Sequence, residues 1–196
     1  MLSMKKGSKV RDCMLLEEQY QVTEYGFLSN VNEHKIKEII RNFILMQKVP
    51  IFFILELPTN EIEERRLRKN DTDSFHTDVY YLDGLNANEA IDLLNQYGEL
   101  LVQDGISSFG FGAHDSSAEI MASKYNVVTV YTKKLDTYKD FFEKCSIPRV
   151  EHCVTAWDTF TENCPGESLC VEIDGKTVFS LPEELKKRGL YFAERR

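Results

Sequence analysis

Residues 105–160 read GISSFGFGAHDSSAEIMASKYNVVTVYTKKLDTYKDFFEKCSIPRVEHCVTAWDTF. The segment SSFGFGAH at 107–114 predicts a strand that ends in a glycine-containing turn. Ser116 and Glu119 form the Ser-x-x-Glu pattern of a helix N-terminus, and Asp115 precedes them. We therefore expect a helix directly after this turn.

The second half of the same stretch continues the alternation of strands and helices. The segment VVTVYT at 127–132 is rich in β-branched residues and predicts a strand. A helix is expected from Asp136 and must end before Pro148, because the residue before a proline avoids the α region. HCVTAWDTF at 152–160, which holds the only tryptophan, predicts another strand.

The region before this stretch follows the same rule. Residues 33–47 carry one apolar stripe with helical spacing, which consists of Ile36, Ile39, Ile40, Phe43 and Ile44. IFFILEL at 51–57 has no polar side chain before Glu56 and predicts a strand buried on both faces. VYYLDGL at 79–85 predicts a strand, and Asn86 with Glu89 predicts a capped helix after it.

The C-terminal region predicts a β-hairpin and an edge strand. Asp174 and Gly175 favour a tight turn between LCVEI and KTVFSL. GLYFA at 189–193 follows a short helix, and Arg195 and Arg196 would protect it as an edge strand.

This order predicts a single domain of the α+β or α/β class, with a mixed central β-sheet packed with helices and a C-terminal β-hairpin. At 196 residues the chain is long enough to bury a core of its own. We expect residues 1–12 to fray. Residues 59–77 are almost all charged or turn-forming, which predicts a short exposed helix and a mobile loop.

The charge and the cysteines narrow the class of protein. The formal net charge is −8, which disfavours nucleic acid and anionic membrane surfaces and suits a basic protein partner. The five cysteines are odd in number and form no Cys-x-x-Cys pair. The start of the chain lacks the apolar segment of a secretory signal. We therefore expect a cytoplasmic protein with reduced thiols.

Two motifs fall short of a cofactor or metal site. Gly110 and Gly112 precede the expected helix, as in many phosphate-binding loops, but Asp115 stands where a third glycine would be and would repel phosphate. The alternative is a purely structural role, in which the glycines relieve crowding in a strand. The four histidines are scattered, so no two ligands share a metal-binding motif. We expect no cofactor and no metal.

A catalytic arrangement of His114, Asp115 and Cys153 is the alternative hypothesis. A nucleophilic cysteine requires a histidine within hydrogen-bonding reach. His152 adjoins Cys153, so in a strand the two side chains would point to opposite faces, and only His114 is left as the partner. The competing interpretation is a buried thiol that behaves as a small apolar side chain.

Trp157 is the candidate centre of a protein-binding surface. Exposed aromatic side chains often dominate such interfaces. The acidic residues around it in sequence, which would suit a basic partner, are Glu151, Asp158, Glu162 and Glu167. A tryptophan in the core with an ordinary solvated rim is the alternative.

Three segments together resemble small bacterial immunity proteins of polymorphic toxin systems, including contact-dependent growth inhibition: FGFGAHDSSAEIMASKYNVVTVYT (109–132), TAWDTF (155–160) and GLYFAERR (189–196). The resemblance lies in general texture over the C-terminal half, without a diagnostic motif, so no site residue is carried over. It implies a non-enzymatic inhibitor that occludes a toxin domain, often a basic nuclease. The alternatives are a small cytosolic hydrolase or transferase using Cys153, and a small-molecule sensor using the glycine turn. The oligomeric state is left open.

Overall fold

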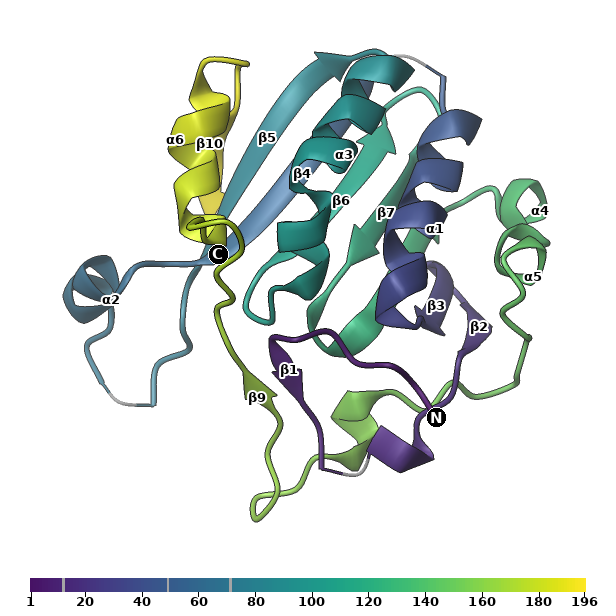
Figure 1. Cartoon of the computed structure of the whole chain (residues 1–196), viewed down its shortest axis with the longest axis horizontal. Helices are drawn as coiled ribbons and strands as arrows, with labels where there is room; N and C mark the ends of the chain where they lie inside the picture. The colour runs from purple at the N-terminus through teal and green to yellow at the C-terminus, as the bar shows by residue number, and fades with distance from the viewer. Residues whose placement is uncertain (12, 49, 71) are drawn as a thin grey trace.

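The computed structural model describes residues 1–11, 13–48, 50–70 and 72–196 and forms a single α+β domain (Figure 1). Its main sheet has the order β10-β5-β4-β6-β7-β8-β3-β2, and β1 (Ser8–Lys9) pairs separately with β9 (Glu167–Ser168). The strands of the main sheet are β2 (Gln19–Thr23), β3 (Gly26–Asn30), β4 (Ile51–Pro58), β5 (Thr77–Leu85), β6 (Ser108–Ala113), β7 (Ala118–Ala122), β8 (Val127–Thr132) and β10 (Tyr191–Arg195). The predicted fold class is confirmed.

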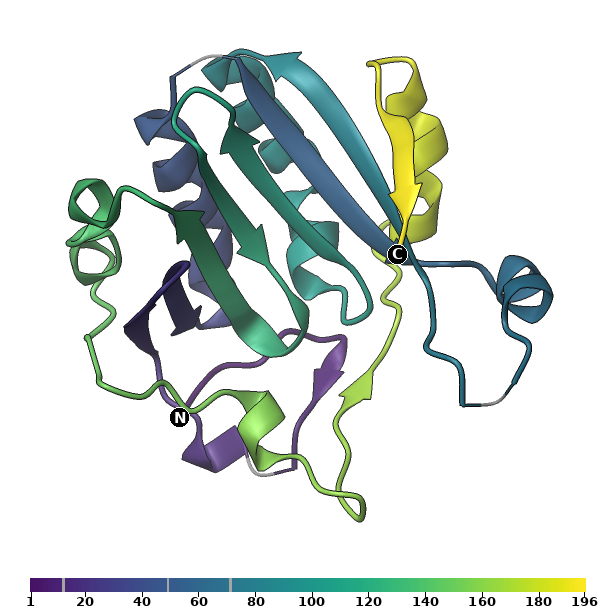
Figure 2. The ribbon, with the colours of Figure 1, turned by 180° about the vertical axis from the view of Figure 1, so that it is seen from behind.

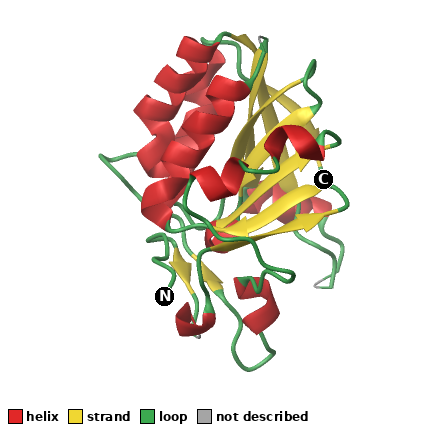
Figure 3. Ribbon diagram, turned by 90° about the vertical axis from the view of Figure 1, so that its right-hand side faces the viewer, coloured by secondary structure: helices red, strands yellow, loops and turns green. Residues whose placement is uncertain are grey.

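The two longest helices cover one face of this sheet (Figure 3). They are α1 (Glu33–Met46) and α3 (Ala87–Gln103), and all five residues of the predicted apolar stripe of α1 are buried. The capping box predicted for Asn86 and Glu89 is present at the start of α3. The shorter helices are α2 (Glu61–Leu67), α4 (Leu135–Tyr138), α5 (Phe141–Lys144) and α6 (Leu181–Lys186), and 3-10 turns lie at Cys13–Leu15, Lys124–Asn126, Ala156–Thr159 and Val178–Ser180.

The helix predicted after Ser116 is wrong, because this segment forms strand β7. Residues 114–117 make a tight turn in which Ser117 takes a positive φ of 51°. The Ser116 hydroxyl donates to the Ala113 carbonyl, 3.0 Å away, instead of capping a helix. In AEIMA, Ile120 lies in the main core while Glu119 is on the opposite face, which is the alternation of a strand. β6, β7 and β8 thus form a meander. The sheet was predicted to be mixed, but all pairs of neighbouring strands described in the main sheet are antiparallel.

The strand predicted for residues 152–160 is also wrong, and the hairpin predicted around Asp174 and Gly175 is reduced to its turn. Residues 152–160 form a loop and a 3-10 turn, because the Asp158 carboxylate accepts hydrogen bonds from the backbone and hydroxyl of Thr155. The Asp174–Gly175 turn is present, but it closes only one bridge, between Ile173 and Lys176. The predicted edge strand near the C-terminus is confirmed as β10.

The structure describes residues 1–11, 59–70 and 72–77 of the segments expected to fray or move. Leu2 belongs to a buried cluster with Leu16 and Tyr125, and Leu2 and Lys5 are each only 3% exposed; residue 12 lies outside the described residues. Residues 59–76 contain α2, the exposed helix that the sequence predicts, which stands away from the sheet in Figure 1. The prediction of mobility there includes residue 71, which lies outside the described residues. None of the helices in the described ranges is long and apolar enough to cross a membrane.

Because Lys5 is buried, we expect the free energy of unfolding to increase as the pH rises from neutral to alkaline values. Its ammonium group donates to the Ser123 carbonyl at 3.0 Å, and burial lowers its pKa to about 8. The unfolded chain holds this proton more tightly, so the charged form destabilises the folded state below pH 8 and this penalty fades as the pH rises above 8. We expect the wild type to gain roughly 1 kcal/mol of unfolding free energy between pH 7 and pH 9 relative to Lys5→Met. Urea denaturation of both proteins at both pH values measures this difference, and identical pH dependence would refute it.

Candidate functional site

The face of the main sheet opposite α1 and α3 is not covered by a helix in the described part of the chain, and we call it the open face (Figure 2). Strand register defines its residues, because directly paired residues point to the same side. One row across the sheet contains Tyr191, Tyr81, Ile54, Gly110 and Met121. The next row contains Phe52, Gly112, Glu119 and Tyr131.

The two glycines of β6 let side chains of β4 and β7 meet across the strand between them. A Cβ at Gly110 would lie 2.5 Å from the Met121 sulfur, and a Cβ at Gly112 would lie 2.3 Å from the Phe52 ring. Met121 and Ile54 therefore pack together above Gly110, although their strands are not neighbours. The two glycines therefore relieve crowding within a strand, as the alternative to a phosphate-binding loop proposed, and the element that follows them is strand β7 rather than a helix.

Aromatic rings extend over the upper part of the open face. Tyr81 stacks with Tyr191 at a centroid distance of 6.5 Å, and Phe52 contacts Tyr81 at 5.6 Å. His114, in the β6–β7 turn, packs on Phe52 at 4.9 Å. The Tyr191 hydroxyl also donates to Asp83 at 2.7 Å. These contacts make a continuous aromatic row from β10 to the turn after β6.

A pocket of about 330 Å³ lies beside this row, and we call it the acid pocket. Its apolar members are Ile54 and Met121, which are 2% and 5% exposed. The remaining residues carry aromatic or polar groups: Glu56, Tyr81, Glu119, Ser123, Tyr131 and Arg196. The pocket thus combines an apolar floor with two tyrosines and two carboxylates.

The charges in and beside the acid pocket do not balance. Arg196 contacts Glu56 at 3.1 Å and Glu194 at 2.6 Å, so one guanidinium serves two carboxylates. Glu119 forms no ion pair within the described residues. Glu56 and Glu194 therefore share one cation and Glu119 adds a further carboxylate, so the pocket and its surroundings have an excess of negative charge.

Burial acts on the ionisable groups of the acid pocket. Desolvation raises the pKa of Glu56 and of Glu119; the Glu56 charge raises that of Glu119 further, and Arg196 opposes both shifts. Desolvation also raises the pKa of Tyr81 and of Tyr131. The carboxylates thus hold their negative charge at some expense to stability, an arrangement that a bound cation would relieve.

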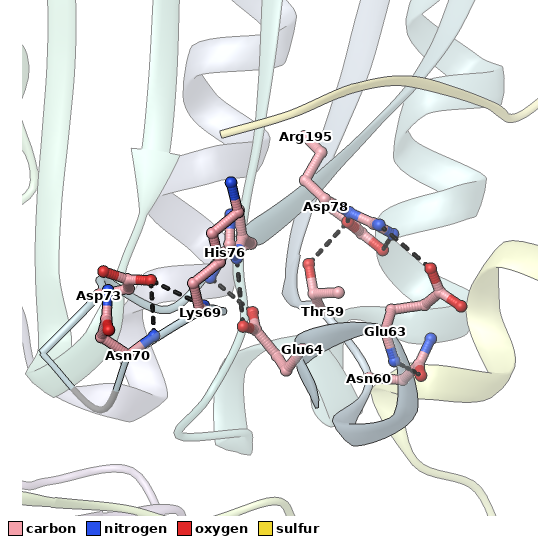
Figure 4. A network of polar contacts seen from close by, with 10 residues as sticks. All are labelled: Thr59, Asn60, Glu63, Glu64, Lys69, Asn70, Asp73, His76, Asp78 and Arg195. Atoms are coloured by element: carbon pink, nitrogen blue, oxygen red, sulfur yellow. Dashed lines mark hydrogen bonds and ion pairs between the residues drawn. The ribbon is translucent and has the colours of Figure 1, made fainter. Parts of the chain in front are cut away.

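A polar network beside α2 fixes β10, the strand that directly precedes Arg196 (Figure 4). Arg195 donates to both oxygens of Asp78, at 2.5 and 2.9 Å, and lies 3.6 Å from Glu63. Thr59 donates to the same Asp78 carboxylate at 2.8 Å. The backbone of Arg196 then pairs with Thr77, which holds its side chain beside the acid pocket.

The same network anchors α2 through a histidine. Glu64 accepts a hydrogen bond from the backbone of His76 at 2.6 Å and contacts its ring nitrogen at 3.1 Å. Burial would raise the pKa of Glu64, but these hydrogen bonds outweigh it and lower the pKa. After the end of α2, the Asp73 carboxylate accepts hydrogen bonds from the backbone N–H groups of Lys69 and Asn70. Glu63 and Glu64 therefore tie α2 to β10 and to the residue that precedes β5.

The structure places the predicted Trp157 surface on a separate part of the molecule. Trp157 is 54% exposed and lies edge-on against Tyr125, with ring centroids 4.9 Å apart. Asp158 caps the 3-10 turn, and hydrogen bonds from Thr155 lower its pKa. Glu167 contacts Lys9 at 2.9 Å.

Two of the predicted acidic partners of Trp157 thus already have internal roles. Glu151 and Glu162 are exposed. A role for Trp157 and its acidic neighbours in partner binding stays a prediction.

The alternative catalytic residues lie at opposite ends of the sheet. Cys153 is 1% exposed, its backbone binds the Gln21 side chain, and its sulfur faces the Gln19 carbonyl near the end of β3 at Asn30. His114 and Asp115 are exposed in the turn between β6 and β7. The register of β7, β8 and β3 places this turn at the end of the sheet opposite to Asn30. Burial raises the pKa of the Cys153 thiol to about 11. Cys153 therefore has the environment of an inert core thiol.

The sequence interpretation missed Glu56, Glu119, Tyr81, Tyr131 and Arg196 as a site. A usable signal was the placement of single glutamates inside apolar strands. Glu56 interrupts the apolar run of β4, and Glu119 stands between Ala118 and Ile120. The pairing of β4, β6 and β7 places these two carboxylates on the same face of the sheet, and both line the acid pocket.

Comparison of the chain with protein-family models, with curated proteins and with solved structures found no match.

Proposed function

We propose that this protein is a non-enzymatic, intracellular protein-binding module of the immunity type, which neutralises a cognate toxin domain by covering a basic surface with its open face. The observation that carries the proposal is the acid pocket beside a row of aromatic rings: Glu56 and the neighbouring Glu194 share the Arg196 guanidinium, and Glu119 has no ion pair within the described residues. Aromatic side chains supply contact area in protein interfaces, and complementary charge speeds and orients the encounter. The net charge of −8 favours a basic partner.

The arrangement of Cys153 argues against the alternative of a cysteine hydrolase or transferase. A nucleophilic thiol must be accessible and ionised. Cys153 is 1% exposed, burial raises its pKa to about 11, and His114 lies at the other end of the sheet. Binding by the open face needs neither group.

The test is co-purification of the tagged protein with the products of the genes adjacent to its own, at low and high salt. We expect a 1:1 complex whose association rate constant falls as salt is added. Salt screens the attraction between exposed charges, with a Debye length of about 10 Å at 0.1 M. The double variant Glu56→Gln, Glu119→Gln should weaken the complex by roughly tenfold to a hundredfold, because it removes two desolvated charges. It should not lower the unfolding free energy at pH 7, since burial disfavours both charges.

The control variant is Glu99→Gln, which removes an exposed charge from α3 on the helix side. It should bind as the wild type does. Trp157→Ala tests the second predicted surface in the same assay. A complex that tolerates the Glu56 and Glu119 changes but is lost with Trp157→Ala would refute the open face as the binding surface. The absence of any complex would refute the immunity function.

A further inference from the structure

The geometry of the acid pocket points to a specific occupant: the side chain of one arginine from the partner protein. This inference rests on the proposed function and adds the chemistry of the central contact. It assigns Glu119 and Glu56 as the groups that receive the guanidinium, and Tyr81 and Tyr131 as the rings beside it.

The volume and floor of the pocket suit a long side chain with an apolar stem. At about 330 Å³ it is at the small end of the range for ligand pockets. Ile54 and Met121, which are 2% and 5% exposed, form an apolar floor on which methylene groups can lie. Arginine buries its stem along apolar surface while its charged head remains near polar groups.

The aromatic rings and carboxylates that line the pocket suit a guanidinium in particular. Tyr131 is 46% exposed, and Tyr81 is half-buried against Phe52, so both bring ring surface to the pocket. A guanidinium stacks on aromatic faces and binds carboxylates in a bidentate manner, whereas an ammonium is a compact, strongly hydrated charge. The planar head of arginine therefore matches this combination of rings and carboxylates better than lysine does.

The charge balance gives the occupant its sign. Arg196 already serves Glu56 and Glu194, and Glu119 has no ion pair within the described residues. One further cation would bring the local charge closer to neutral and would relieve the repulsion between Glu56 and Glu119. An anionic occupant would meet the carboxylates of Glu56 and Glu119, and a neutral one would leave Glu119 without an ion pair within the described residues.

The experiment uses N-acetyl-arginine methylamide as the probe, titrated into the full chain and followed by NMR at constant ionic strength. We expect millimolar binding that shifts the ring signals of Tyr81 and Tyr131. The lysine analogue should bind at least about threefold more weakly, and the neutral citrulline analogue should not bind. Glu119→Gln should weaken binding about tenfold, and Glu99→Gln should leave it unchanged.

Three outcomes would overturn the inference: no shift of Tyr81 or Tyr131 up to tens of millimolar probe, equal binding of the citrulline analogue, or equal binding of the lysine analogue. These results are separate from the test of the proposed function. A protein complex that depends on Glu56 and Glu119, together with a silent arginine probe, would leave the function standing and remove the arginine. Probe binding without any protein complex would leave the pocket and remove the function.

Discussion

Replacing Gly105 with alanine is expected to lower the unfolding free energy by roughly 3–5 kcal/mol, since one methyl group would separate three chain segments. A Cβ at Gly105 would lie 1.8 Å from the Gly7 carbonyl oxygen and 2.5 Å from its carbonyl carbon. Both are backbone atoms, so no side-chain rotation relieves the overlap. Backbone hydrogen bonds that join Gly7, Gly105 and Leu169 at 2.8 and 3.0 Å would be lost. Thermal unfolding measures the effect, and we expect the midpoint to fall by about 10 °C or more.

Gly98→Ala is the matched control for this prediction. Gly98 lies inside α3 with ordinary helical backbone, and a Cβ there would meet only flexible side-chain ends at 3.3–3.4 Å. Alanine forms helix more readily than glycine by about 1 kcal/mol, so this variant should be as stable as the wild type or more stable. A midpoint for Gly105→Ala equal to that of Gly98→Ala would show that the segment around Gly7 yields without loss.

Removing the Arg195 side chain is expected to destabilise the fold by about 3 kcal/mol at neutral pH, because it leaves Asp78 desolvated without its counter-ion. The Asp78 side chain is 9% exposed. Burial alone would raise its pKa, but hydrogen bonds from Arg195 and Thr59 outweigh burial and lower it. A carboxyl whose pKa is lowered by folding stabilises the fold above its unfolded pKa and loses this effect as the pH falls through the folded pKa. The difference between Arg195→Ala and the wild type should therefore shrink in acid.

The double variant Asp78→Leu, Arg195→Met controls for the loss of packing. Replacing a whole buried pair with apolar side chains is often neutral, whereas removing one partner is not. Chemical denaturation of the wild type, of Asp78→Leu, of Arg195→Met and of the double variant gives the coupling energy between Asp78 and Arg195. If the double variant is as unstable as Arg195→Ala, the loss does not come from an unpaired charge.

The parts of the fold with long, clear periodicity could be predicted from the sequence, and the short ambiguous segments could not. α1 spans 14 residues, so its apolar stripe excludes a strand, and the apolar run of β4 is equally clear. AEIMA in β7 has five residues, too few to separate a period of 2 from one of 3.6. There the Ser116-x-x-Glu119 pattern favoured a helix, and cross-strand pairing with β6 and β8 prevailed.

The candidate site was harder to predict than the fold for a physical reason. Glu56 and Glu119 are far apart in sequence, and β6 lies between their strands, with Ser108 opposite Glu56 and Gly112 opposite Glu119. Local patterns contain no information on which strand will be inserted between two others. Trp157 is conspicuous in sequence because it is the only tryptophan, but rarity does not report where a side chain lies.

The pairing of Ser8 in β1 with Ser168 in β9 also bears on how fast the protein folds. Contacts between residues so distant along the chain slow folding, because closing the long loop between them costs chain entropy before any favourable contact forms. The meander β6–β7–β8 needs only short turns and can form early. We expect the β1–β9 pair to join last during refolding and to open first in native-state hydrogen exchange, ahead of the global unfolding of the sheet.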